Sequence, residues 1–259
     1  MELTVTRAET EAELAEVFGL RYEVYVEEMG RYRDTADHER RQLSDPEDAH
    51  SWVFAGHRDG RLVATGRLTW GGDAGFSERQ RLQYRLDPFL AELPEAVMGI
   101  GERLMVRPEL RGTPTLDQLL DGAKALTEHL GIRVMFGACE PHLLSLYLRM
   151  GQRTYADRNI NSAEAGYLIP LINFVPPDSP LEGLGGATDP DTGAPALPRC
   201  IAQVLANEGA VTSGILADPN EYGSEIARAL HEISADIHAF AGFTDDETRR
   251  CVERSNIIH

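Results

Sequence analysis

The turn over residues 107–114 carries the residue types that bind a phosphate group. Arg107 and Arg111 supply positive charge, and the pair Arg111-Gly112 opens a turn whose backbone N–H groups can point at an anion just before a helix. Pro114 has no N–H, so the turn offers one donor fewer than a glycine-rich loop. The alternative is an ordinary connection between a strand and a helix, in which a threonine of the turn caps the helix.

A second group of candidates follows the next predicted strand, in the segment GACEPH of residues 137–142. Cys139 and His142 together suggest a nucleophile and its base. A buried structural cysteine is the more common role, and His142 can simply stand at the start of a helix. The histidines of the chain show no spacing with carboxylates that suggests a metal, so no metal site is expected.

Composition narrows the class of protein. The chain has 259 residues and a net charge of −17, which argues against a nucleic-acid partner. It holds no apolar run long enough to span a membrane, and its N-terminus lacks the apolar region of a secretory signal. The three cysteines lie far apart, as in a protein of the reducing cytoplasm, which is the expected location.

Charge is unevenly distributed. Residues 103–158 contain eight basic and six acidic side chains, a local surplus of positive charge in an acidic protein. Such a surplus suggests a site for an anionic group. The alternative is arginine scattered over solvated helix faces.

The elements that must position these residues begin with a helix over residues 10–29, for which Thr10 is the expected N-cap. A charged loop with a short helix follows at 30–50. Two strands over 51–70 surround an Asp-Gly turn, a strong hairpin signal. The next strand covers 96–106, where Gly99 and Gly101 suggest a β-bulge.

The rest of the first 175 residues alternates helices and strands: a helix at 115–131, a strand at 132–139, a helix at 141–151 and a strand at 165–174. A strand, a helix and a strand in succession predict a parallel pair. The expected fold class is therefore α/β, with a mixed, partly parallel central sheet flanked by helices. Residues 176–198 are rich in Pro and Gly and read as a linker or long loop. Residues 199–259 read as a helical C-terminal extension, with helices at 199–209 and 219–240, which leads toward a further domain.

The order of elements, with RLMVRPELRG and LYLRMGQRTY, resembles the GNAT acyltransferase superfamily over residues 3–174. The resemblance implies that backbone N–H groups after the strand hold the phosphates of an acyl-thioester cofactor. The implied cofactor-binding residues are Val106, Arg107, Arg111, Gly112 and Thr113. A tyrosine four residues before a glycine, here Tyr147 before Gly151, is implied to protonate the departing thiolate.

The N-terminal part, LRYEVYVEEMGRY followed by LVATGRLT, is similar to one branch of that superfamily: autoinducer (acyl-homoserine-lactone) synthases and long-chain N-acyl amino acid synthases. The residues that this branch implies for substrate binding are Arg21, Tyr25, Asp45, Asp48 and Arg67, with which Cys139 and His142 are grouped. These arginines and aspartates are expected to form an ion-pair network near the acceptor, an arginine holding the carboxylate of an amino acid. Ordinary surface ion pairs are the alternative.

The branch has a strand motif Glu-x-x-Arg-Leu-x-Val, and this chain meets half of it. Arg103-Leu104 and Val106 fit, whereas Ile100 stands where the glutamate is expected. Glu102 offers a carboxylate one residue before Arg103, on the opposite side of a regular strand. The expected catalytic residues are Tyr147, Glu102 and Arg103, with Glu102 taking the amine proton through water.

The resemblance implies an N-acyltransferase that moves a fatty acyl group to the amine of an amino acid or related small molecule. The expected donor is acyl-phosphopantetheine on acyl carrier protein, or acyl-CoA, and no metal takes part. Acyl carrier protein is therefore an expected partner. Two alternatives stay open: a short-chain acetyltransferase that uses acetyl-CoA, and a non-catalytic sensor of acyl ligands. The last residues of the chain faintly resemble the entry helix of cyclic-nucleotide-binding domains.

Overall fold

The computed structural model describes residues 2–140, 143–156, 160–162, 166–175, 184 and 197–206. The helix expected at 219–240 and most of the expected linker lie outside these residues. The chain divides into two compact units, which are described separately: Met1–Glu78 with Glu95–Met135, and Arg79–Pro94 with Phe136–His259.

The first unit contains a sheet in the order β1-β2-β3-β4, in which all three pairings are antiparallel. Its strands are β1 (Thr4–Arg7), β2 (Trp52–Arg58), β3 (Arg61–Trp70) and β4 (Met98–Val106), and β5 (Val134–Cys139) begins here beside β4. Its helices are α1 (Glu11–Arg21), the π-helix η1 (Tyr22–Glu28), the 3₁₀ helices η2 (Pro46–His50), η3 (Glu95–Val97) and η4 (Pro108–Leu110), and α4 (Thr115–His129). The sequence interpretation did not include β1.

The hairpin between β2 and β3 has the predicted turn. Asp59 and Gly60 both adopt positive φ, +53° and +75°, and Arg58 pairs with Arg61. Two central residues with positive φ are the mark of a type I′ turn, whose twist matches that of the flanking strands.

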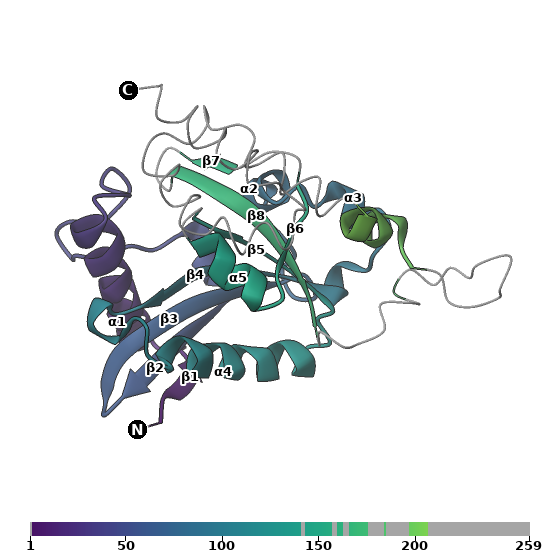
Figure 1. The fold of residues 1–259 in the computed structure, drawn as a ribbon. Helices are drawn as coiled ribbons and strands as arrows, with labels where there is room; N and C mark the ends of the chain where they lie inside the picture. The colour runs from purple at the N-terminus through teal and green to yellow at the C-terminus, as the bar shows by residue number, and fades with distance from the viewer. Residues whose placement is uncertain are drawn as a thin grey trace, which may run out of the picture. The chain divides into compact units, whose positions relative to one another are not determined.

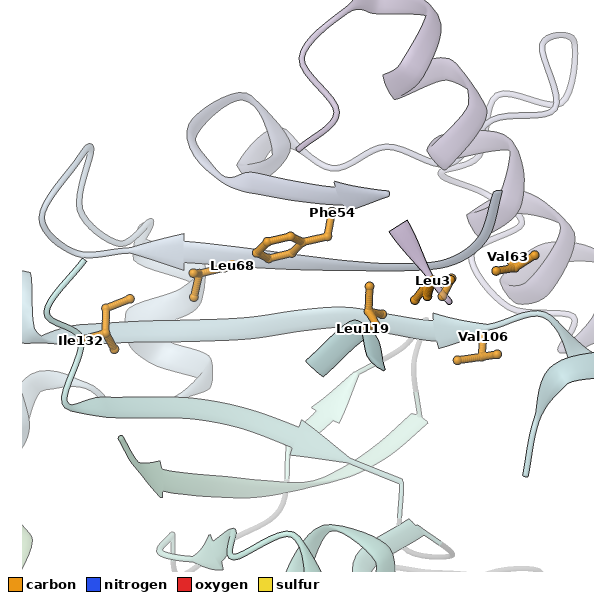
Figure 2. Close-up of a cluster of buried hydrophobic side chains, with 8 residues drawn as sticks. Leu3, Phe54, Val63, Leu68, Val106, Leu119 and Ile132 are labelled. Carbon is orange, nitrogen blue, oxygen red and sulfur yellow. The ribbon is translucent and has the colours of Figure 1, made fainter. Parts of the chain in front are cut away.

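Two helices cover opposite faces of this sheet (Figure 1). On one face, α1 packs Val17 and Leu20 against Val53, Leu62 and Met105. On the other face, α4 packs Leu119 against the strands that carry the cluster shown in Figure 2. That cluster consists of Leu3, Phe54, Val63, Ala64, Leu68, Val106, Leu119 and Ile132. Strand β4 therefore contributes to both hydrophobic layers, with Val106 in one and Met105 in the other.

The second unit contains most of β5, with β8 next to it and β6 next to β8. Its helices are α2 (Glu78–Gln83, whose first residue belongs to the first unit), α3 (Asp87–Leu90) and α5 (Leu144–Arg149), and residues 199–206 are also helical. Its other strands are β6 (Arg153–Thr154), β7 (Ile160–Ser162) and β8 (Gly166–Phe174). Both β6 and β7 pair antiparallel with β8. Phe89, Phe136 and Tyr155 pack edge to face, with ring centroids 4.9–5.8 Å apart. Such aromatic contacts stabilise a core beyond simple burial.

Candidate functional site

The helix that carries the first site residues begins as predicted and then changes type. The side chain of Thr10 accepts a hydrogen bond from the backbone N–H of Glu13, and the Glu13 carboxylate accepts one from the N–H of Thr10, which forms a capping box. The α-helical hydrogen bonding stops at Arg21, and the next seven residues form the π-helix η1. π-Helices are rare, mostly form a single turn within an α-helix, and are frequent at functional sites.

Strand β4 has a β-bulge at Arg103. Thr65 pairs with Met105 and Arg67 pairs with Glu102, so two residues of β4 lie opposite the single residue Gly66 of β3. Arg103 takes the left-handed conformation, φ +57°, which is unusual for a residue with a Cβ. The prediction of a bulge at Gly99 and Gly101 is wrong, because both pair regularly with β3, opposite Trp70 and Leu68.

The bulge changes the direction of the side chains around it. In a regular strand, Glu102 and Arg103 would point to opposite faces, as the sequence predicted. Here Glu102 accepts a hydrogen bond from Arg67 at 2.8 Å, and Arg67 also binds Asp45, the partner of Arg103. The expectation of opposite faces is therefore wrong: the left-handed residue brings both side chains into one cluster.

Arg67 of β3 lies at the centre of this cluster. Its Nη1 donates to Asp45 Oδ2 at 2.8 Å and to Asp48 Oδ1 at 3.0 Å, and its Nη2 donates to Glu102. Asp45 is the N-cap of η2, and the Asp48 carboxylate accepts a hydrogen bond from the Asp45 backbone N–H at 2.7 Å. This short helix therefore fixes both aspartates.

Two further arginines complete the cluster. Arg21, the last residue of α1, donates from Nη1 to both oxygens of Asp48, at 2.9 and 2.7 Å. Arg103 grips Asp45 with Nε and Nη2, both at 2.7 Å. Three guanidinium groups thus meet three carboxylates, so the cluster is formally neutral. We call these six residues, Arg21, Asp45, Asp48, Arg67, Glu102 and Arg103, the ion cluster.

The side chains of the ion cluster differ in their exposure to solvent. The side chains of Arg21 and Arg67 have no exposed surface, whereas those of Arg103 and Asp45 are 10% and 15% exposed. Among described residues, the Nε and Nη2 atoms of Arg21 are buried without a hydrogen-bond partner. The cluster therefore has a buried end at Arg21 and a solvent-facing end at Arg103.

The pKa values of Asp45 and Arg103, two members of the ion cluster, are shifted in favour of their charged forms. Burial alone would raise the pKa of Asp45, but the hydrogen bonds and charge of Arg103, with the charge of Arg67, lower it to about 2. Burial would lower the pKa of Arg103, and its hydrogen bonds to Asp45 raise it instead. Both groups are therefore in their charged forms at neutral pH.

Two tyrosine rings cover the guanidinium of Arg103. The guanidinium carbon lies 4.4 Å from the ring centroid of Tyr32 and 5.1 Å from that of Tyr25, and the two rings meet edge to face. Burial raises the pKa of Tyr32. Sequence reasoning found Tyr25 and missed Tyr32, for which the available signal was an aromatic residue in an otherwise charged loop.

The arginines of the turn after β4 are occupied by carboxylates of η1. Arg107 donates from Nη1 to Glu23 and from Nε to the carbonyl of Leu62. Arg111 binds both oxygens of Glu28 and donates from Nε to the carbonyl of Val106. Each of the two arginines is thus held by one carboxylate of η1 and by one backbone carbonyl.

The remaining turn residues shape the start of α4. Gly112 adopts φ +74°, where a side chain would be strained. Thr113 donates to the carbonyl of Leu110 at 2.6 Å and lies 2.8 Å from the hydroxyl of Thr115. Pro114, not a threonine, is the N-cap, and it has no side-chain hydrogen bond. Arg58 approaches the same helix end through Thr115, at 2.9 Å.

Three predicted residues are not part of these contacts. Tyr147 lies on α5 and Cys139 ends β5, both in the second unit, and His142 falls outside the described residues. Cys139 is buried, and this burial raises the pKa of its thiol. A thiol held protonated in this way is a poor nucleophile, in keeping with a structural cysteine.

Within the described residues, no group of three or more His, Cys, Asp or Glu side chains could hold a metal ion. The same part of the chain contains no helix long and apolar enough to cross a membrane.

Comparison with known protein families identifies one that the chain matches. Residues 16–166 match the model of the N-acyl amino acid synthase FeeM family. No curated protein matches the sequence. Solved structures with a similar fold include a CoA-dependent acyl-homoserine lactone synthase, BjaI, in complex with MTA. It shares 15% identity with a TM-score of 0.51, over 67% of this chain and 83% of that one.

Two more solved structures share the fold. FeeM, an N-acyl amino acid synthase from uncultured soil microbes, is 13% identical with a TM-score of 0.50, over 68% of this chain and 92% of that one. MesI, a CoA-dependent acyl-homoserine lactone synthase, is 22% identical with a TM-score of 0.50, over 68% and 90% of the two chains. The predicted fold, a mixed sheet with parallel and antiparallel strands flanked by helices as in GNAT acyltransferases, is confirmed.

Proposed function

The chain belongs to the N-acyl amino acid synthase FeeM family, and on that premise we propose that it transfers a fatty acyl group from acyl carrier protein, or less readily from acyl-CoA, to the amine of an amino acid or related small molecule. The family makes it an N-acyltransferase.

The observation that carries the proposal is the ion cluster built around the bulge of β4. A bulge re-aims the backbone of a strand, and a backbone N–H aimed at a thioester carbonyl stabilises the negative charge that develops on its oxygen. Arg103 keeps this distorted backbone in place because Asp45 grips its side chain with two hydrogen bonds. The cluster thus supports the bulge in the pairing of β4 with β3.

The acceptor is proposed to bind at the solvent-facing end of the ion cluster. Arg103 and Asp45 are its most exposed members, and Tyr25 and Tyr32 flank Arg103. A guanidinium and a carboxylate side by side complement the carboxylate and the amine of an amino acid. Arg21 and Arg67 have no exposed surface, so they position the aspartates and do not touch the acceptor.

The reaction forms a bond between the amine nitrogen and the carbonyl carbon and breaks the bond between that carbon and sulfur. Glu102 accepts the proton that the amine loses, through a water molecule, and Tyr147 donates a proton to the departing thiolate. Arg107 and Arg111 meet the donor phosphate. A carrier-bound phosphopantetheine arm is the favoured donor, because Pro114 removes one N–H from the turn that would hold a pyrophosphate.

Mass spectrometry of reaction products tests the proposal. The protein is incubated with an amino-acid pool and, separately, with palmitoyl-acyl carrier protein, palmitoyl-CoA or acetyl-CoA. A long-chain N-acyl amino acid formed mainly from the carrier protein is the expected result. It should be lost in Arg103→Ala and retained in Arg40→Ala, which removes an exposed arginine outside the ion cluster. Acetylated product from acetyl-CoA alone would instead favour a short-chain acetyltransferase.

A further inference from the structure

We propose that Glu23 and Glu28 are specificity-determining residues that disfavour CoA as the donor. The inference rests on the proposed function, because it concerns the turn at which the donor phosphate is proposed to bind. Glu23 and Glu28 belong to the π-helix η1, which is a different element from the turn. No sequence motif indicated these two residues.

The contacts place these carboxylates on the arginines of the turn. Glu23 binds Arg107, and Glu28 binds Arg111 through both of its oxygens. The arginines are at the same time anchored by their Nε atoms to the backbone carbonyls of Leu62 and Val106. An arriving phosphate therefore finds guanidinium groups that are correctly placed and already neutralised.

The π-helix is the reason that one element supplies both carboxylates. Its hydrogen bonds join residues five apart, as in the bond from the N–H of Met29 to the carbonyl of Val24 at 3.0 Å. Glu23 and Glu28 are also five apart, so they lie on the same side of η1. In an α-helix, residues five apart would point about 140° away from each other, and one of the two arginines would lose its partner.

The two possible donors differ in the number of negative charges that they bring to the turn. CoA presents a pyrophosphate and a further phosphate, whereas a phosphopantetheine arm presents a single phosphate. Each added negative charge near Glu23 and Glu28 is repelled by them, and the attraction of Arg107 and Arg111 is already offset. A third arginine beside the turn, Arg61, is likewise paired, with Glu109. The repulsion therefore grows with the number of phosphates.

The Glu28–Arg111 pair is exposed, and exposed ion pairs are individually weak, so this pair does not prevent a phosphate from binding. Glu28 and Arg111 are 38% and 47% exposed, and a single phosphate can displace one carboxylate at small cost. Discrimination against a polyanion follows from the summed charge. If the pairs served only to stabilise the fold, their removal would change the binding of both donors equally.

The test measures the dissociation constants of CoA and of 4′-phosphopantetheine by calorimetry, on the whole chain, without turnover. The variants are wild type, the double variant Glu23→Gln/Glu28→Gln, and Glu27→Gln as control. Glu27 lies on the same π-helix but pairs with Arg41, away from the turn. All the substituted side chains are partly exposed, and thermal unfolding checks that each variant is folded.

The double variant is expected to bind CoA about tenfold more tightly and phosphopantetheine no more than about twofold more tightly, while Glu27→Gln matches wild type. The gain for CoA should shrink when salt is raised to about 0.5 M, because salt screens exposed charges. An unchanged ratio between the two ligands would overturn the inference and leave the proposed function intact. Absence of binding by either ligand to wild type and variants alike would overturn the donor site itself.

Discussion

Arg103 and Asp45 are joined by two hydrogen bonds of 2.7 Å. The guanidinium belongs to the bulge of β4, and the carboxylate belongs to the N-cap residue of η2. The two residues are separated by 57 others along the chain. This bidentate pair ties the charged loop after the N-terminal helix to the central strand. The conformation of this loop is therefore coupled to the position of β4.

The left-handed conformation of Arg103 has a measurable cost. A residue with a Cβ is destabilised by about 1 kcal/mol at such φ values, and glycine is not. Arg103→Ala and Arg103→Gly both remove the side chain, so their difference isolates the backbone. The glycine variant is expected to be the more stable by about 1 kcal/mol in urea unfolding.

The same two substitutions at Arg61, an exposed strand residue without positive φ, serve as the control for the bulge. There alanine should be the more stable, because glycine loses more chain entropy on folding. Equal or reversed stabilities at position 103 would mean that the left-handed backbone carries no strain.

The lowered pKa of Asp45 predicts how stability depends on pH. Its pKa falls from an ordinary 3.8 to about 2 on folding, so the native state holds the ionised form more strongly than the unfolded state does. This contribution, about 2 kcal/mol, is fully present above pH ~4 and is lost as pH falls toward 2.

Asp45→Asn should therefore be less stable than wild type at pH 7, by about 3 kcal/mol, because it leaves Arg103 without its charged partner. The difference between the two proteins should shrink between pH 4 and pH 2, measured by urea unfolding at each pH. Asp34→Asn, an exposed aspartate, is the matched substitution and should show little change. A constant difference across that range would contradict the assigned role of Asp45.

Gly99 lies where the side chains around it are tightly packed. A Cβ at this position would lie 2.7 Å from the sulfur of Met135 and 3.1 Å from Ile132, whereas one at Gly66 would meet only Leu104, at 3.6 Å. Gly99→Ala should destabilise the protein by about 1–3 kcal/mol, and Gly66→Ala by less than 1. Chemical unfolding of the two variants provides the measurement, and a fully stable Gly99→Ala would show that this layer of the core can move apart.

Tyr147→Phe tests the proposed proton donor. Removal of the hydroxyl should lower kcat by about 10²–10³ while the dissociation constant of the donor changes little, because the group acts only as the thiolate departs. Single-turnover kinetics with a carrier-bound donor would separate the two effects. Full activity of Tyr147→Phe would assign the proton to another group or to water.

Much of the fold was predictable because its signals are local. Thr10 and Glu13 form a capping box from four consecutive residues, and an Asp-Gly pair sets the hairpin turn. The family resemblance brought Arg21, Asp45, Asp48 and Arg67 together, and the structure places them in one cluster. A sequence motif points to such residues because it depends only on residue types and their order along the chain.

The features that escaped prediction depend on tertiary contacts. The bulge lies at Arg103, not at a glycine, because its cost is offset by the contacts of Arg103 with Asp45 and two tyrosine rings. The N-terminal periodicity indicated a helix but not its change at Tyr22 from α to π hydrogen bonding. Strand β1 has only four residues, too few for a reliable pattern before its pairing with β2 is known.

The π-helix also affects how the sequence should be aligned with its relatives. A turn that joins residues five apart contains one residue more than an α-helical turn of the same segment, so an alignment to an α-helical relative needs a gap between residues 22 and 28. Without that gap, the residues on one side of η1 are each aligned one position away from their counterparts in the relative. Positions before η1, such as Arg21, and positions after it, such as Tyr32, then have to be matched to a relative separately, by structural superposition of each side.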